Sequence, residues 1–129
     1  MLIATEQQHH KELILLVDDN KLLREVMAIM LKDEGYDVEE AQDGLGALEL
    51  LRSIKQKPSC IILDLMMPVM NGEEFLTQLE TKEDLPLSSI PVIIYSAEGM
   101  LGVHPQVVAR LEKPISIELL FGAIKGVLN

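Results

Sequence analysis

Hydrophobic residues in this chain fall into two kinds of segment. Short, unbroken apolar runs are typical of strands that are buried on both faces of a sheet. Longer segments in which apolar residues recur every three or four positions are typical of helices that cover such a sheet. The predicted strands cover residues 13–17, 36–41, 60–63, 91–95 and 109–112. The predicted helices cover residues 21–34, 46–56, 73–80 and 116–128.

The alternation of these segments predicts an α/β fold, a (βα)5 series with five parallel strands between two layers of helices. Gly35 is expected to end the first helix. The segment before Lys113 contains Gly99, Gly102 and Pro105, which oppose a long helix. We therefore expect the fourth helix of the series to be short, displaced or missing. Residues 1–11 are predicted to form a flexible tail, and residues 12–129 a single domain.

Polar side chains directly follow four of the predicted strands. Asp18 and Asp19 come directly after the first run, and Asp64 follows residues 60–63. Ser96 follows residues 91–95, and Lys113 follows the last short strand. In an open parallel sheet, functional groups gather just beyond the carboxyl ends of the strands. We therefore expect these five side chains to meet at one edge of the sheet.

Three carboxylates in one place repel one another unless a cation lies between them, and hard oxygen ligands suit Mg²⁺. Lys113 can supply a second positive charge, and Ser96 can supply a neutral donor. This combination is complementary to a phosphoryl group, with the Asp64 carboxylate as a nucleophile that forms an acyl phosphate.

Simpler structural roles compete with this interpretation. Asp18 could cap the first helix, although Asn20 is an equally good candidate. Ser96 could be an ordinary turn or capping residue, and Lys113 could be a solvated surface side chain. Asp64 fits such a role poorly, because an unpaired charge inside "IILDLMMP" would cost several kcal/mol.

Composition narrows the functional classes. The chain has 129 residues, with 21 acidic and 11 basic side chains and a net charge of -10. Such a surface repels phosphate backbones, so we expect no direct binding to nucleic acid. The single cysteine, Cys60, excludes an internal disulfide framework and fits a reducing compartment. No apolar stretch is long enough to cross a membrane, so the expected location is the cytoplasm.

Four sequence blocks carry a resemblance to a known family. "LVDDN", "IILDLMMPVMNGEEF", "IIYSAE" and "LEKPI" occur in this order. Together they resemble the motif blocks of the CheY-like receiver domains of two-component response regulators, over residues 13–128. The resemblance implies a flavodoxin-like, doubly wound sheet and a phosphoprotein with Asp64 as the phosphoacceptor. It also implies Mg²⁺ binding through Asp19, Asp64 and the backbone carbonyl of Met66, with Asp18 acting partly through water.

The same resemblance implies roles for the remaining site residues and for partners. Ser96 would form a hydrogen bond to the phosphoryl group, and Lys113 would contact it from the opposite side. The peptide bond before Pro114 is expected to be cis. The phosphoryl donor would be a sensor histidine kinase or a histidine phosphotransfer protein, and the output would be contact with a downstream protein target. Arg110 stands where such domains usually carry an aromatic switch residue, so that switch cannot operate in its usual form.

The first predicted helix has apolar residues over a wider arc than the covering of a sheet requires. We expect part of the surplus, Leu23, Met27 and Leu31, to be exposed as a docking patch for the helical bundle of the phosphodonor. The alternative is that the final helix or the N-terminal tail covers these residues.

His104 is expected to be a loop residue without a function.

The resulting prediction is a phosphoacceptor signalling domain rather than an enzyme. One alternative is a Mg²⁺-dependent phosphohydrolase with an aspartyl nucleophile. Such enzymes typically need a second acid two residues after the nucleophile, where this chain has Met66. The other alternative is a receiver-like binding module that is not phosphorylated. The sequence ends with the last predicted helix, so we expect no output domain within it, and both a stand-alone protein and the front part of a longer one remain open.

Overall fold

The computed structural model describes residues 12–67, 70–81, 86–96, 104–114 and 116–128. The predicted tail, residues 1–11, lies outside the described residues. Within them, five strands form one parallel sheet in the order β2-β1-β3-β4-β5, which confirms the predicted fold class. The strands are β1 (Leu13–Val17), β2 (Asp37–Ala41), β3 (Cys60–Asp64), β4 (Val92–Ser96) and β5 (Val107–Glu112).

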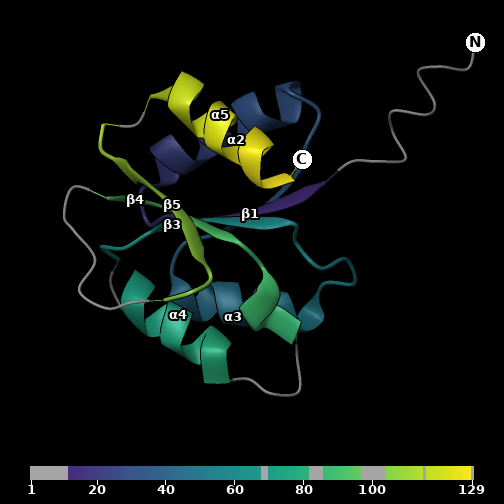
Figure 1. Cartoon of the computed structure of the whole chain (residues 1–129), viewed down its shortest axis with the longest axis vertical. Helices are drawn as coiled ribbons and strands as arrows, with labels where there is room; N and C mark the ends of the chain where they lie inside the picture. The colour runs from purple at the N-terminus through teal and green to yellow at the C-terminus, as the bar shows by residue number, and fades with distance from the viewer. Residues whose placement is uncertain (1–11, 68–69, 82–85, 97–103, 115, 129) are drawn as a thin grey trace, which may run out of the picture.

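Helices cover both faces of this sheet (Figure 1). α2 (Lys21–Asp33) and α5 (Ile117–Leu128) lie on one face, and α3 (Gly44–Ser53) and α4 (Gly72–Thr81) lie on the other. A short 3-10 helix, η1 (Pro86–Ser89), precedes β4. No helix among the described residues is long and apolar enough to cross a membrane.

Helix boundaries follow the capping residues. Asn20 caps α2 through a hydrogen bond from the Leu23 N–H, and the helix ends before Gly35, whose φ of 104° needs glycine. α3 begins earlier than the predicted residue 46, because the Asp43 side chain accepts a hydrogen bond from the Gly46 N–H. The predicted anomaly of the fourth helix falls on residues 97–103, which lie outside the described residues. The described residues between β4 and β5 contain no helix.

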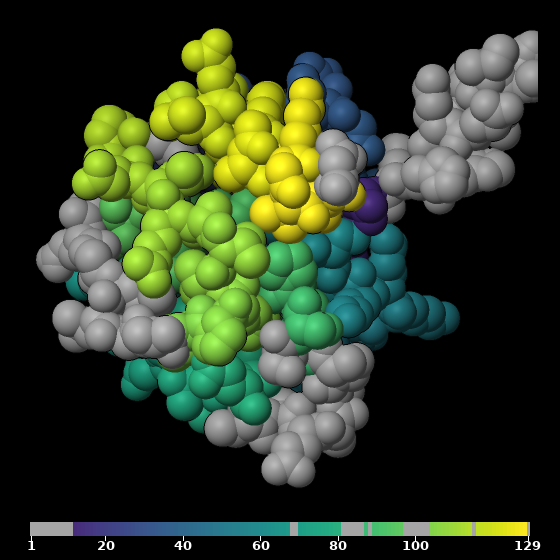
Figure 2. Space-filling view, viewed as in Figure 1, coloured from purple at the N-terminus to yellow at the C-terminus, as the bar shows by residue number. Residues whose placement is uncertain are grey.

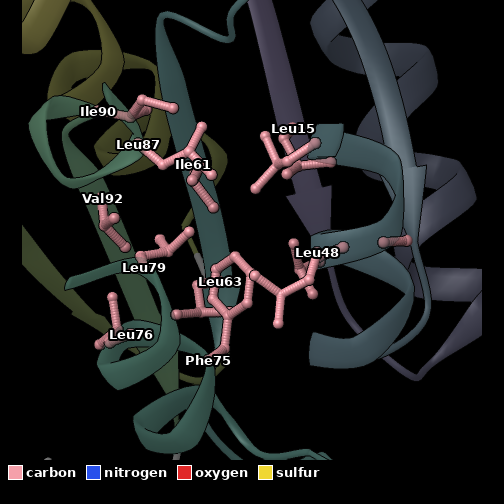
Figure 3. Packing of buried hydrophobic residues seen from close by; sticks show 14 of the residues in the cluster. Leu15, Leu48, Ile61, Leu63, Phe75, Leu76, Leu79, Leu87, Ile90 and Val92 are labelled. Carbon is pink, nitrogen blue, oxygen red and sulfur yellow. The ribbon is translucent and has the colours of Figure 1, made fainter. Parts of the chain in front are cut away.

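The core has two halves, one on each face of the sheet. Alternate residues of the central strands point to opposite faces, so each strand contributes to both halves. On the α3–α4 side, Phe75 of α4 packs beside Leu63 of β3 and towards Leu48 of α3 (Figure 3). Cys60 is buried in the other half, where burial raises the pKa of its thiol to about 12. It is therefore a packing residue.

The prediction for the exposed face of α2 was wrong. Met27 and Leu31 are buried, and Leu23 packs against the same half of the core. These three residues face the sheet and α5, so the final helix covers them, which is the alternative that the sequence left open. The apolar residues of α2 that are exposed are Leu22, Val26 and Ile29.

His104 lies in the loop before β5, as predicted, but the sequence did not reveal its contacts. Its side chain is buried, and each ring nitrogen contacts a carboxylate of α4. Nδ1 lies 2.6 Å from Glu80 Oε2, and Nε2 lies 2.7 Å from Glu73 Oε1. His104 therefore joins the turn before β5 to both ends of α4, an arrangement that we call the His104 clasp.

β5 is an edge strand, and it lies beside α5 on one face of the molecule (Figure 2). Its side chains alternate between partly buried and exposed positions. Arg110, at the position of the usual aromatic switch, is one of the exposed residues.

Candidate functional site

The strand alternation that builds the core also positions the site. Asp18, Asp64 and Lys113 each follow, by two residues, an apolar side chain of the α2–α5 half of the core. Residues two apart on a strand point to the same face. The three polar side chains therefore extend rows of core residues beyond the carboxyl edge of the sheet.

Three carboxylates meet at this edge, as the sequence predicted. One oxygen from each of Asp18, Asp19 and Asp64 lies within 4.8 Å of the others. Asp18 and Asp64 are buried, and Asp19 is exposed to solvent. An all-oxygen donor set of this charge, open on one side, fits a hard divalent cation such as Mg²⁺.

Asp64 has a defined partner for each carboxylate oxygen. Oδ1 accepts a hydrogen bond of 3.1 Å from the Met66 N–H, and Oδ2 accepts one of 3.2 Å from Lys113 Nζ. Burial raises the pKa of Asp64, and the nearby Asp18 charge adds to the increase, while the Met66 and Lys113 contacts oppose it. In this arrangement a bound cation would favour the ionised, nucleophilic form.

Each carboxylate oxygen of Asp18 also accepts a hydrogen bond from the protein. Oδ1 accepts a hydrogen bond of 2.9 Å from the Asn20 N–H, and Oδ2 accepts one from the hydroxyl of Tyr95. Its backbone carbonyl accepts a hydrogen bond of 2.7 Å from Arg24, which also pairs with Glu40 at 3.0 Å. Because Asn20 caps α2, Asp18 is not the capping residue that the sequence left as an alternative.

Tyr95 is the residue of this site that the sequence analysis missed. It is fully buried, and it is the register partner of Asp64 in the neighbouring strand. Lys113 Nζ lies 5.0 Å from the centre of its ring. Burial, followed by the hydrogen bond to Asp18, raises the pKa of Tyr95, so the phenol remains a proton donor. The available signal was one polar-tipped aromatic residue at the end of an aliphatic run.

The structure also describes Ser96, Met66 and the peptide bond before Pro114. Ser96 is buried at the end of β4, and its carbonyl accepts a hydrogen bond of 3.2 Å from the Lys113 N–H. By alternation its side chain belongs to the row opposite that of Tyr95. The Met66 side chain is exposed, while its backbone contacts Asp64. The peptide bond between Lys113 and Pro114 is cis, as expected.

Gly72 keeps the start of α4 close to the end of β3. Its N–H donates a hydrogen bond of 2.9 Å to the Leu65 carbonyl. A Cβ at this position would lie 2.8 Å from Leu65 Cα and 3.0 Å from the Asp64 carbonyl oxygen. Only glycine allows α4 to approach the residues after Asp64 this closely.

Comparison with known proteins identifies the family. A model of the response regulator receiver domain matches residues 14–125. The chain belongs to this family. A curated relative, the response regulator MprA of Mycolicibacterium vanbaalenii, is 36% identical over 117 residues, which are 90% of this chain and 50% of the relative. This receiver domain therefore spans about half the length of the curated relatives it matches.

Solved structures of similar fold agree with this assignment. The chemotaxis protein CheY4 of Vibrio cholerae has a TM-score of 0.79 and 28% identity, covering 92% of this chain and 100% of that one. A CheY-like receiver domain from Methanospirillum hungatei has a TM-score of 0.79 and 26% identity, covering 92% and 95%. The flavodoxin-like fold of receiver domains is therefore the fold of this chain.

Proposed function

We propose that this receiver domain accepts a phosphoryl group on Asp64, in a Mg²⁺-dependent reaction, from a histidine kinase or a histidine phosphotransfer protein. The observation that carries the proposal is the position of Asp64. It is a buried carboxylate with an ammonium group on one oxygen and two further carboxylates within 4.8 Å. A purely structural aspartate would not require this concentration of negative charge.

The reaction follows from the groups present. An Asp64 oxygen attacks the phosphorus atom, forming an acyl phosphate as the phosphorus–nitrogen bond to the donor histidine breaks. As negative charge develops on the phosphoryl group, the Lys113 ammonium group moves from the Asp64 carboxylate to a phosphoryl oxygen. Ser96 donates a hydrogen bond to another phosphoryl oxygen. Mg²⁺, when bound, offsets the charge that develops on the transferring oxygens.

We assign the cation to Asp19, Asp64 and the backbone carbonyl of Met66. Asp18 would act partly through a water molecule. Its two oxygens already accept hydrogen bonds from the protein, which supports an indirect role. Asp19 is the exposed member of the three and is free to turn towards an ion that enters from solvent.

The donor would dock on the exposed side of α2. Its apolar residues Leu22, Val26 and Ile29 are spaced for one helical face, and α2 begins two residues after Asp19. We therefore assign this face to a helix of the donor's bundle, which would bring a phosphorylated histidine close to Asp64. The patch differs in its residues from the one predicted by sequence, but it lies on the same helix.

The test of the phosphoacceptor is intact mass after incubation with Mg²⁺ and a small acyl phosphate. We expect one added phosphoryl group in the wild type and none in Asp64→Asn, which keeps a similar volume while removing the nucleophile. Addition of EDTA before the donor should prevent the change in mass. A wild-type protein that remains unmodified while folded would contradict the proposal and support a binding module that uses the fold alone.

A further inference from the structure

The two buried carboxylates of the site are held by the same pattern of contacts. In each, one oxygen accepts a hydrogen bond from the backbone N–H two residues later in the chain, at Asn20 or Met66. The other oxygen accepts a hydrogen bond from a side chain that belongs to the strand two places away in the sheet, or directly follows it. For Asp64 this donor is Lys113, and for Asp18 it is Tyr95.

Tyr95 also touches the cationic side of the site. Its ring face lies 5.0 Å from Lys113 Nζ, within the range of a cation–π contact. One side chain from β4 therefore contacts Asp18 through its hydroxyl and Lys113 through its ring. These are the groups on either side of Asp64. Tyr95 itself is fully buried and in register with Asp64, so its position is fixed by the sheet.

We propose that Tyr95 is a positioning residue that orients Asp18 for the metal and supports Lys113 beside the phosphoacceptor. This inference rests on the proposed function, because it assigns Tyr95 a role in the same Mg²⁺ site. A neutral phenol can fix the direction of the Asp18 carboxylate without neutralising it. An ammonium group at this position would compete with the cation for the same charge.

Without the Tyr95 hydroxyl, the Asp18 carboxylate would lose one of the two hydrogen bonds that fix its orientation. A carboxylate that can rotate presents the wrong oxygen for much of the time, so binding of the metal must first restore its orientation. Loss of such an outer partner typically weakens metal affinity by about tenfold or more. The ring contact with Lys113 does not need the hydroxyl and would survive in phenylalanine.

The experiment compares three variants in calorimetric titrations with MgCl2. Tyr95→Phe removes only the hydroxyl, and we expect its dissociation constant for Mg²⁺ to be about tenfold higher than that of the wild type. Tyr36→Phe is the matched control, because Tyr36 precedes β2 at the opposite edge of the sheet, and we expect it to bind Mg²⁺ as the wild type does. Melting temperatures measured in EDTA establish that each variant is folded.

Tyr95→Leu separates the contribution of the ring. At saturating Mg²⁺, we expect Tyr95→Leu to take a phosphoryl group from a small acyl phosphate more slowly than Tyr95→Phe does, because leucine removes the ring that lies against Lys113. If Tyr95→Leu fails to fold, the affinity of Tyr95→Phe still decides the role of the hydroxyl.

The outcomes distinguish this inference from the proposed function. Equal Mg²⁺ affinity in the wild type and Tyr95→Phe would overturn the role of Tyr95 and leave the phosphoacceptor proposal intact. An equal loss of affinity in Tyr36→Phe would overturn it as well, because the effect would then be general. A wild type that binds no Mg²⁺ and accepts no phosphoryl group would overturn both.

Discussion

Gly72 is a residue at which the surrounding atoms leave no room for a side chain. Of the three nearest atoms that a Cβ would meet, one is Leu65 Cδ2, and the other two are backbone atoms of Leu65 and Asp64, which cannot turn aside as a flexible side chain can. We expect Gly72→Ala to lower the free energy of unfolding by about 1–3 kcal/mol, the usual range for overpacking. The shift of Leu65 should also slow phosphorylation at its neighbour, Asp64.

Gly126 provides the matched control for this substitution. A Cβ at Gly126 would have no neighbouring atom within 4 Å, and the residue lies in the exposed last turn of α5. Gly126→Ala should leave stability unchanged or raise it by up to about 1 kcal/mol, because alanine favours helix. Urea unfolding of both variants gives the comparison. Equal stability of Gly72→Ala and the wild type would show that the loop after Asp64 can yield.

Single residues differ in how well sequence reveals them. Asp18 and Asp64 could be predicted because each ends an apolar run, and Lys113 because it follows the last short strand, at the edge where a parallel sheet collects its functional groups. Tyr95 could not, because an aromatic residue within a strand is usually part of the core. Its hydroxyl acquires a role only through Asp18, which lies 77 residues away in the sequence.

At the scale of elements, the His104 clasp joins α4 to the turn before β5. Burial alone would lower the pKa of His104, but the hydrogen bonds and charges of Glu80 and Glu73 outweigh it, and the pKa is raised. The folded protein therefore holds the proton of His104 more tightly than the unfolded chain does. The stabilisation from the charged clasp is fully present below the ordinary pKa of about 6.5 and is lost as pH rises through the raised pKa.

This linkage predicts a loss of stability on the alkaline side. Between about pH 6 and pH 8, largely below the range in which the Cys60 thiol of the unfolded chain ionises, we expect the free energy of unfolding of the wild type to fall by about 1 kcal/mol, the scale of a charged hydrogen bond that is partly exposed. His104→Gln keeps a polar side chain without this titration, and its stability should be nearly flat over the same range. A pH profile of His104→Gln that parallels the wild type would assign the dependence to other groups.

Elements also show where a sequence pattern stops being informative. The width of the apolar arc on α2 was evident, but the rotation of the helix was not. The rotation depends on packing against the sheet and against α5, which lies far along the chain. A pattern along one helix identifies its apolar side, and only the neighbouring elements decide which edge of that side remains exposed.

At the scale of the whole molecule, the exposed α2 face defines how a donor would approach. Ile29 is 67% exposed, so Ile29→Glu should leave the fold intact and place a charge within the proposed interface. We expect transfer from the cognate histidine kinase or phosphotransfer protein to slow about tenfold, the size of a moderate interface hot spot. Phosphorylation by a small acyl phosphate, which needs no docking, should be unchanged.

Leu45 offers a control on the other side of the sheet. It is an exposed apolar residue of α3, so Leu45→Glu adds the same charge to the opposite helical layer. Transfer from the protein donor should proceed at the wild-type rate in this variant. Equal slowing of both variants would attribute the effect to net charge, and unimpaired transfer to Ile29→Glu would exclude the α2 face.

The parallel sheet also separates the site from the ends of the described chain. β1 starts at the amino edge of the sheet, and α5 runs back from the carboxyl edge, so both ends lie on the side away from Asp64 (Figure 1). Either end can therefore be tethered to a surface, a dye or a fused protein without covering the acidic cluster. This geometry suits the domain to use as an immobilised sensor, in which phosphorylation and donor docking are followed at the free edge.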